Sequence, residues 1–168
     1  MISLRNRVHL AVPADRVWAC FGDMEHLYDR WIPEHLRWRW LFGEPLAKGT
    51  IWHADEWVGP MRINARFQVI DCEPGRYFSW RILSFPAAVV RTRGSFRFSP
   101  SPDGGCDMDQ EVHLGFRVPA VAQVLDLAMR LVLPLAEFRR HMRDEGDNLI
   151  HLISSRSPAG NSQPAPLP

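Results

Sequence analysis

Alternating apolar and polar side chains run through the middle of the chain in a series of short segments. They lie at about 50–61, 62–71, 76–84, 89–99 and 107–118. Alternation with a period of two is typical of strands that have one buried and one solvated face. The stretches 71–75 and 99–105 are rich in Pro, Asp and Gly, which favour hairpin turns. The pattern predicts an antiparallel sheet whose wet face carries cross-strand charge pairs.

The residues before these segments predict two further strands and two short helices. Residues 3–12 alternate, and His9 falls on the polar face of this strand. Pro13 suits the first turn of a helix. A second short helix is expected from Met24 to Trp31, because Pro33 disfavours a helical residue before it. An alternating strand that contains Trp38 follows.

A long helical pattern runs from Pro119 to about Ile153, and Pro134 is expected to kink or restart it. Its apolar positions define one broad face, on which a histidine and a glutamate sit among leucines. The face comprises Leu127, Leu131, Phe138, His141, Glu145, Leu149 and Leu152.

Length and composition limit the class of protein. With 168 residues, the chain is expected to form one domain over 1–153, followed by a disordered tail over 154–168 that is poor in apolar residues. A formal net charge of +1 argues against nucleic acid as a partner. The most apolar run, 118–136, is interrupted by charged residues and by Pro134, so no membrane span is expected. Three cysteines without a CxxC pair indicate a reducing cytoplasm. The sequence leaves open whether the chain forms a homodimer.

His141 and Glu145 are four residues apart, so they lie on one helix face, one turn apart. A neutral imidazole and a carboxylate at this spacing can hold one divalent metal ion between them. The alternative is an ordinary surface pair, and the apolar neighbours of the two residues weaken it.

Two more polar residues lie in apolar surroundings. His35 lies just after Pro33 and next to the tryptophan-containing strand, where a packed, hydrogen-bonded core histidine is the simpler interpretation. Glu56 shares a strand face with Trp52, and a carboxylate on an apolar face needs a partner. An arginine is the simple candidate for that partner, and a metal ion is the other.

The order of the elements resembles the START-like, or polyketide cyclase/SRPBCC, superfamily with its helix-grip fold. The resemblance covers about residues 3–153, beginning with the segment Val-His-Leu-Ala-Val-Pro-Ala-Asp-Arg-Val-Trp-Ala-Cys-Phe-Gly-Asp. It implies an α+β fold with two short helices after the first strand. A curved antiparallel sheet of six to seven strands then wraps around a long C-terminal helix and leaves a cavity for an apolar or aromatic small molecule.

Three segments are similar to a narrower branch, the 2,4-diacetylphloroglucinol and phloretin hydrolases. They are Trp-Ile-Pro-Glu-His at 31–35, Gly-Thr-Ile-Trp-His-Ala-Asp-Glu at 49–56, and His-Met-Arg-Asp-Glu at 141–145. Those enzymes hold zinc with two histidines and two glutamates. The resemblance therefore implies a zinc site formed by His35, Glu56, His141 and Glu145, although iron and manganese suit these donors as well. This chain is shorter than those hydrolases, and its interval between the first two ligands also looks shorter.

The implied reaction is hydrolysis of the carbon–carbon bond between an acyl group and a phenolic ring. The ring carbon then needs a proton, and four nearby residues are candidates for its donor: Tyr28, His26, His53 and Asp55. Aromatic residues of the strands could form the pocket walls or be ordinary core: Trp38, Trp52, Trp80, Phe96 and Phe98.

Two other functions compete with a metal-dependent hydrolase. One is a metal-free polyketide cyclase or carrier of hydrophobic ligands, in which His141 and Glu145 would bond to other side chains. The other is a binding or regulatory module like the toxin–antitoxin or chaperone-activator members of the superfamily. The charged outer face of the predicted sheet argues weakly against that last function.

Overall fold

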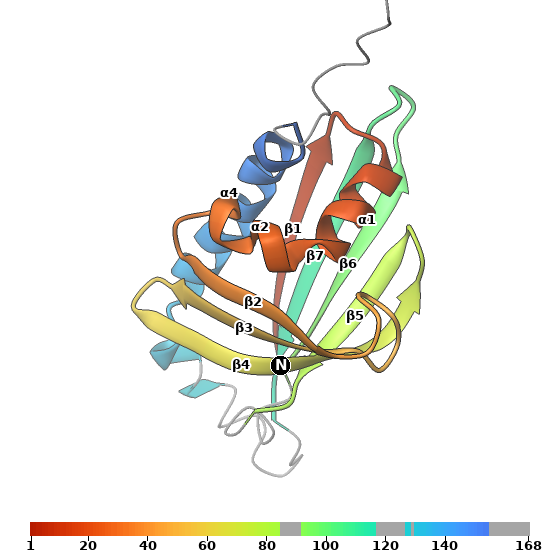
Figure 1. Cartoon of the computed structure of the whole chain (residues 1–168). Helices are drawn as coiled ribbons and strands as arrows, with labels where there is room; N and C mark the ends of the chain where they lie inside the picture. The colour runs from red at the N-terminus through yellow and green to blue at the C-terminus, as the bar shows by residue number, and fades with distance from the viewer. Residues whose placement is uncertain (85–91, 117–126, 129, 155–168) are drawn as a thin grey trace, which may run out of the picture.

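The computed structural model describes residues 1–84, 92–116, 127–128 and 130–154. These residues form one antiparallel sheet and the helices labelled in Figure 1. The strands are β1 (Ile2–Leu10), β2 (His35–Phe42), β3 (Ile51–Val58), β4 (Met61–Glu73), β5 (Tyr77–Ile82), β6 (Arg93–Pro100) and β7 (Cys106–Leu114). The helices are α1 (Ala14–Gly22), α2 (Met24–Trp31) and α4 (Leu135–Ser154).

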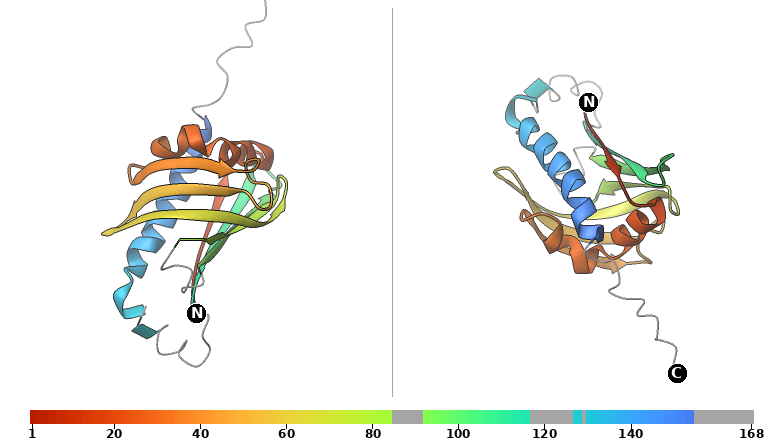
Figure 2. Two further views of the ribbon diagram at one scale, coloured as in Figure 1. Left: turned by 60° about the horizontal axis from the view of Figure 1, so that its bottom comes forward. Right: turned by 90° about the horizontal axis from the view of Figure 1, so that it is seen from above.

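The seven strands follow the order β1-β7-β6-β5-β4-β3-β2, so every neighbouring pair except β1 and β7 is also consecutive in sequence. The sheet curves around α4, and α1 and α2 bridge its two edge strands (Figures 1 and 2). This arrangement confirms the predicted α+β helix-grip fold. It leaves one concave face directed at α4 and one convex face directed outward.

Side chains fix the position of α4 against both edges of the sheet. Asn6 of β1 donates a hydrogen bond from Nδ2 to the carbonyl of Met142, at 2.7 Å. Trp31 of α2 donates from Nε1 to the carbonyl of Glu145, at 2.8 Å. Gly146 lets the helix approach β1, because a Cβ there would lie 3.1–3.3 Å from Asn6 and Val8. These contacts fix the rotation of α4 about its own axis at the turn that carries Glu145.

The core lies between the concave face and the helices, and its centre is aromatic. The ring of Phe21 from α1 lies 4.8–5.6 Å from the rings of Phe78, Phe96 and Phe98. Buried aromatic contacts of this kind stabilise by both area and ring geometry. They close the end of the sheet that α1 covers.

The convex face carries the predicted cross-strand charge pairs. Arg5 of β1 faces Glu111 of β7 at 3.0 Å, and Arg7 faces Asp107 at 3.2 Å. His9 lies between Asp107 and Asp103, at 3.0 and 2.9 Å. The polar side of β1 is thus solvated and paired, as its alternation predicted.

The helical stretch differs from its prediction on the N-terminal side of Pro134. Residues 127–128 and 130–132 are helical, but α4 begins only at Leu135. Leu127 and Leu131, predicted on the buried face, are 60% and 80% exposed. Proline interrupts the helical backbone, so the face of α4 does not continue through the earlier segment. No described helix is long and apolar enough to cross a membrane. The predicted tail lies outside the described residues beyond position 154.

Candidate metal site and ligand cavity

Four polar residues meet where β2, β3 and α4 approach one another. His35 is the first residue of β2 and is directly opposite Glu56 of β3 in the strand register. His141 and Glu145 lie one turn apart on the face of α4 that is directed at the sheet. One ligand atom from each of the four residues lies within 4.8 Å of all the others. The structure brings together all four residues of the predicted ligand set.

Both histidines direct Nε2 toward both carboxylates. His35 Nε2 lies 3.5 Å from Glu56 Oε2 and 3.3 Å from Glu145 Oε1. The corresponding distances from His141 Nε2 are 3.9 and 3.8 Å. Both Nε2 atoms are buried, and neither forms a hydrogen bond with any residue that the structure describes. Orphaned polar atoms are rare in protein interiors and call for an explanation.

A divalent cation at the centre of the cluster fits these observations. Bonds of about 2.0–2.2 Å from zinc to nitrogen and oxygen place two tetrahedral ligands about 3.4 Å apart. The two distances from His35 bracket this value, and those from His141 exceed it by about half an ångström. Two imidazoles and two carboxylates are a donor set that suits zinc, iron or manganese.

Burial shifts the pKa values of the cluster toward neutral forms. It lowers the pKa of His35 to about 4, against the opposing field of Glu56. Burial also lowers the pKa of His141, while Glu145 opposes the shift. The pKa values of Glu56 and Glu145 are raised, again mainly by burial, with the histidines opposing. Neutral imidazole is the metal-binding form, so neither histidine has to lose a proton at neutral pH before it can bind a cation.

Tyr28 of α2 is the one predicted proton donor that reaches the cluster. Its ring stacks on His35 with centroids 3.9 Å apart and an interplanar angle of 5°. Its hydroxyl donates a short hydrogen bond to Glu56 Oε2, the oxygen that faces both histidines. Burial and the neighbouring Glu56 carboxylate raise the pKa of Tyr28 well above its ordinary value, so the phenol keeps its proton.

The other three predicted proton donors lie outside the cavity lining. His26 is on the surface of α2, where Nδ1 lies 2.7 Å from Asp23 Oδ1. His53 and Asp55 occupy the face of β3 that alternates with Trp52 and Glu56. His53 pairs with Asn64, and Asp55 accepts two hydrogen bonds from Arg62, at 2.8 and 2.7 Å. The alternation of β3 explains why sequence neighbours of the cluster point away from it.

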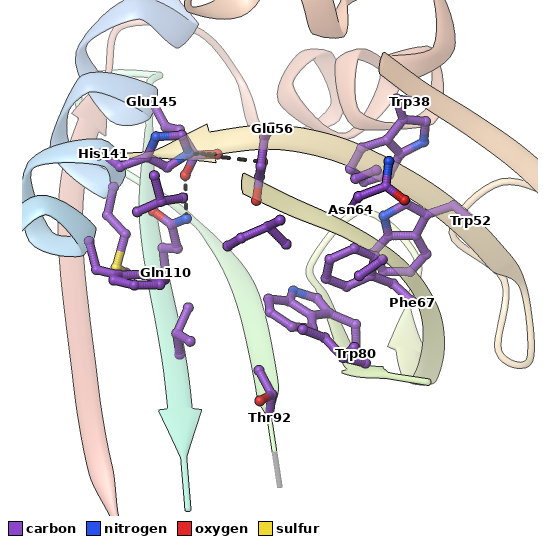
Figure 3. A pocket seen from close by; sticks show the side chains of 18 of the residues that line it. Trp38, Trp52, Glu56, Asn64, Phe67, Trp80, Thr92, Gln110, His141 and Glu145 are labelled. Carbon is purple, nitrogen blue, oxygen red and sulfur yellow. Dashed lines mark hydrogen bonds and ion pairs between the residues drawn. The ribbon is translucent and has the colours of Figure 1, made fainter. Parts of the chain in front are cut away.

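A cavity of about 440 Å³ opens beside the cluster, and its walls are mostly apolar (Figure 3). Tyr28, Glu56, His141 and Glu145 line its polar part, while His35 lies behind them. Four of the five predicted pocket residues line it: Trp38, Trp52, Trp80 and Phe96.

Stacked rings form one wall of the cavity. Trp38 stacks on Trp52, whose ring in turn stacks on Phe67, with centroids 5.0 and 5.2 Å apart. Phe98 was predicted in the pocket, but it is outside the lining. Its ring packs against Trp18 and Phe21 instead, because it lies farther along β6 toward α1.

Gln110 of β7 is a polar residue that sequence reasoning missed. It is only 5% exposed, and its Nε2 donates a hydrogen bond of 2.6 Å to Glu145 Oε2 (Figure 3). Strand alternation places it on the same face as Met108 and Val112, both of which are at least half-buried. An uncharged polar residue inside that apolar stripe was the available signal.

Comparison with known proteins gives a family and a set of similar folds. A family model described as polyketide cyclase / dehydrase and lipid transport matches residues 1–143, a range that holds three of the four cluster residues. No curated protein matches the sequence.

Solved structures resemble the fold over nearly the whole chain at low sequence identity. A protein of Thermus thermophilus has a TM-score of 0.71 at 14% identity, covering 94% of this chain and 100% of its own. The ZhuI aromatase/cyclase of Streptomyces sp. R1128 has a TM-score of 0.67 at 15% identity, covering 94% and 96%. A START superfamily protein of Mycobacterium smegmatis has a TM-score of 0.67 at 12% identity, covering 92% and 99%. At such identities the likeness establishes the fold alone.

Proposed function

The chain belongs to the polyketide cyclase/dehydrase and lipid transport family, and we propose that it is a zinc-dependent hydrolase of acylated phenols or related polyketide-like molecules. One observation carries the proposal. Two buried histidine Nε2 atoms that form no hydrogen bond with any described residue face two carboxylates at the edge of an apolar cavity. A binding protein for hydrophobic ligands has no need of that arrangement, because burying four ionisable groups is costly.

His35, Glu56, His141 and Glu145 would hold the metal ion. When bound, zinc polarises a carbonyl group and lowers the pKa of a water molecule. Three of these residues also line the cavity, so the carbonyl of a bound ligand can reach the cluster. The similarity of the three segments at 31–35, 49–56 and 141–145 to the acylphloroglucinol hydrolases supports the same ligand set.

Hydrolysis adds water across the bond between the acyl carbon and the ring carbon. The acyl carbon takes the hydroxyl group and leaves as a carboxylic acid, while the ring carbon takes a proton. Tyr28 donates a hydrogen bond to Glu56 beside the cluster. Glu56 would hold the metal ion and keep the phenol in place. Tyr28 is the group we assign to deliver its proton to the ring carbon, and the water molecule that supplies the hydroxyl group returns a proton to Tyr28.

The stacked wall suits a planar ligand. Trp52 and Phe67 present ring faces at an interplanar angle of 10°, and Trp80 meets Phe67 edge to face. Aromatic ligands bind such walls by offset or edge-to-face contact. The cavity volume lies in the range of small-molecule sites.

Elemental analysis and turnover test this function together. Protein purified without added metal should contain about one equivalent of zinc per chain. It should also release carboxylic acid from an acylated phenol such as 2,4,6-trihydroxyacetophenone. His35→Ala and His141→Ala should lose both metal and turnover. His113→Ala, which removes a partly buried histidine of the convex face, should keep both. A folded wild-type protein that neither contains nor takes up zinc would refute the proposal.

The alternative is a metal-free cyclase or carrier of hydrophobic ligands. The apolar cavity and the existing hydrogen bond between Tyr28 and Glu56 favour it, since both operate without a cation. The fold shared with an aromatase/cyclase is compatible with it. This alternative predicts ligand binding that is indifferent to chelators, and no zinc uptake.

A further inference from the structure

Gln110 occupies a position where an apolar residue would be expected. It is the middle residue of β7, directly opposite Asn6 of β1 and Phe96 of β6. Its amide Nε2 donates to Glu145, but its amide Oε1 is buried and has no hydrogen-bond partner among the described residues. An unsatisfied buried acceptor is a cost to folding, which methionine or leucine would not incur. The contribution of this side chain therefore lies in the hydrogen bond it donates.

The two carboxylate oxygens of Glu145 have different partners. Oε2 accepts from Gln110, whereas Oε1 faces the Nε2 atoms of His35 and His141 at 3.3 and 3.8 Å. When Glu145 is ionised, as a metal ligand would be, Gln110 must present its Nε2 to it, because an ionised carboxylate can only accept hydrogen bonds. Glu145 is consequently held with one chosen oxygen directed into the cluster.

Glu56 is supported in a different way, and the contrast shows what is special about Gln110. The hydroxyl of Tyr28 donates to Glu56 Oε2, which is also the oxygen that faces both histidines. The donor and the cluster therefore share one oxygen of Glu56. At Glu145 they use different oxygens, so Gln110 leaves the cluster-facing oxygen free.

We propose that Gln110 is a positioning residue for the metal site: it holds Glu145 Oε2, so that this carboxylate offers the cation Oε1 alone. The inference rests on the proposed metal-dependent function. Hydrogen bonds behind metal ligands orient them, and their loss weakens metal binding about 10–100-fold. Without the amide, Glu145 can turn and offer both oxygens, which would change the number of ligand atoms around the cation.

The test compares Gln110→Met with the wild-type protein and with Thr92→Val. Methionine keeps the size of the side chain and removes the donor. Thr92 lines the cavity at its other end in Figure 3, so valine there controls for altered packing of the cavity. Zinc affinity is measured by competition with a chromophoric chelator. Cobalt(II) bound in place of zinc reports the coordination number through the strength of its visible absorption bands.

Gln110→Met should bind zinc about 10–100-fold more weakly, with weaker cobalt bands. It should melt close to the wild-type temperature when both are metal-free, because removal of the unsatisfied Gln110 Oε1 offsets the loss of the hydrogen bond to Glu145. Thr92→Val should match the wild-type protein in zinc affinity and cobalt spectrum. Gln110→Leu, which also lacks the donor, should weaken zinc binding in the same direction and covers the case of a misfolded methionine variant.

Two negative results have different meanings. Unchanged zinc affinity and cobalt spectrum in Gln110→Met would overturn the positioning role and leave the hydrolase proposal standing. Failure of the wild-type protein itself to bind zinc or cobalt would overturn the proposed function, and the role of Gln110 with it.

Discussion

The two faces of the sheet treat ionisable side chains in opposite ways. On the convex face, Glu111 lies 3.0 Å from Arg5 and 3.2 Å from His113, with about a third of its side chain exposed. On the concave side, Glu145 is 8% exposed, and His35 is 2% exposed with no hydrogen bond from Nε2 to any described residue. The convex groups form ion pairs and contact water. The concave groups are shielded from water, and His35 Nε2 lacks a hydrogen bond to any described residue.

The contrast indicates which face of the sheet carries the candidate reactive groups. Solvated ion pairs contribute little to folding and can be exchanged with small effect. Buried and incompletely paired groups oppose folding, so their presence indicates a role outside stability. The predictions below test that division, beginning with the largest expected effect.

Replacing one glutamate on each face with glutamine should separate the two roles. Glu145→Gln is expected to reduce zinc affinity by more than about 100-fold, because a charged ligand becomes a neutral amide. The unfolding free energy of the metal-free variant should rise by about 1 kcal/mol, since a buried carboxylate is removed. Chelator competition and chemical denaturation measure the two quantities.

The matched variant on the convex face is Glu111→Gln. It should leave zinc affinity unchanged and lower stability slightly, because it only weakens exposed pairs with Arg5 and His113. Equal zinc affinities in the two variants would contradict the conclusion that only the concave face contributes to metal binding.

Most of the fold was predicted from the periodic spacing of apolar residues. The second helix was predicted at Met24–Trp31 and lies there, because Pro33 and the break at Gly22-Asp23 act locally. Strand faces followed from alternation, which is why Glu56 was placed correctly beside Trp52. The exposure of Leu127 and Leu131 was missed, because the direction of the helical segment before Pro134 relative to α4 depends on tertiary packing.

The site was predictable only in part. The spacing of His141 and Glu145 paired them as candidate ligands, whereas the full set of four came from a family resemblance. Their convergence required knowledge of how β2, β3 and α4 meet. Gln110 was missed, since nothing near it in sequence indicates that it contacts Glu145, thirty-five positions away. Phe98 was misplaced because alternation gives its face but not its distance from the cavity. Position along a strand is the information that periodicity lacks.

A glycine that packs against the cavity-lining Trp80 offers a test of intermediate size for the concave face. Gly94 of β6 lies opposite Trp80 of β5, and a Cβ at Gly94 would lie 2.1 Å from the indole ring. Gly94→Ala should therefore push Trp80 into the cavity. We expect a loss of about 1–3 kcal/mol in stability from overpacking. Binding of 2-naphthol, followed by tryptophan fluorescence, should weaken.

Gly22→Ala is the control for that substitution. Apart from its chain neighbours and the backbone of its own helix, no described residue comes within 4 Å of a Cβ at Gly22, the last residue of α1. Alanine is the better helix former, so this variant should equal or exceed the wild-type protein in stability and bind 2-naphthol normally. If Gly94→Ala binds the probe as well as Gly22→Ala does, Trp80 does not shape the ligand site.

The smallest expected effect concerns Asp55, a sequence candidate for proton donation that lies outside the cavity lining and pairs with Arg62, which is part of that lining. The hydrogen bonds from the Arg62 guanidinium lower the pKa of Asp55. A carboxyl group whose pKa is depressed by folding adds stability above its unfolded value, near pH 4, and loses it as the pH falls through the folded pKa. Asp55→Asn should accordingly be modestly less stable than the wild-type protein at pH 7, and the difference should shrink toward pH 3.

Denaturant unfolding at the two pH values measures this difference, and Arg62→Gln should reproduce it from the other partner. Zinc content should stay at the wild-type level in both variants, because neither residue belongs to the cluster. Turnover should stay at that level in Asp55→Asn, because Asp55, unlike Arg62, does not line the cavity. Loss of turnover in Asp55→Asn with zinc retained would assign Asp55 to the reaction despite its outward direction. It would also show that the division between a paired convex face and a reactive concave face fails at β3, the strand that supplies Glu56 to the cluster.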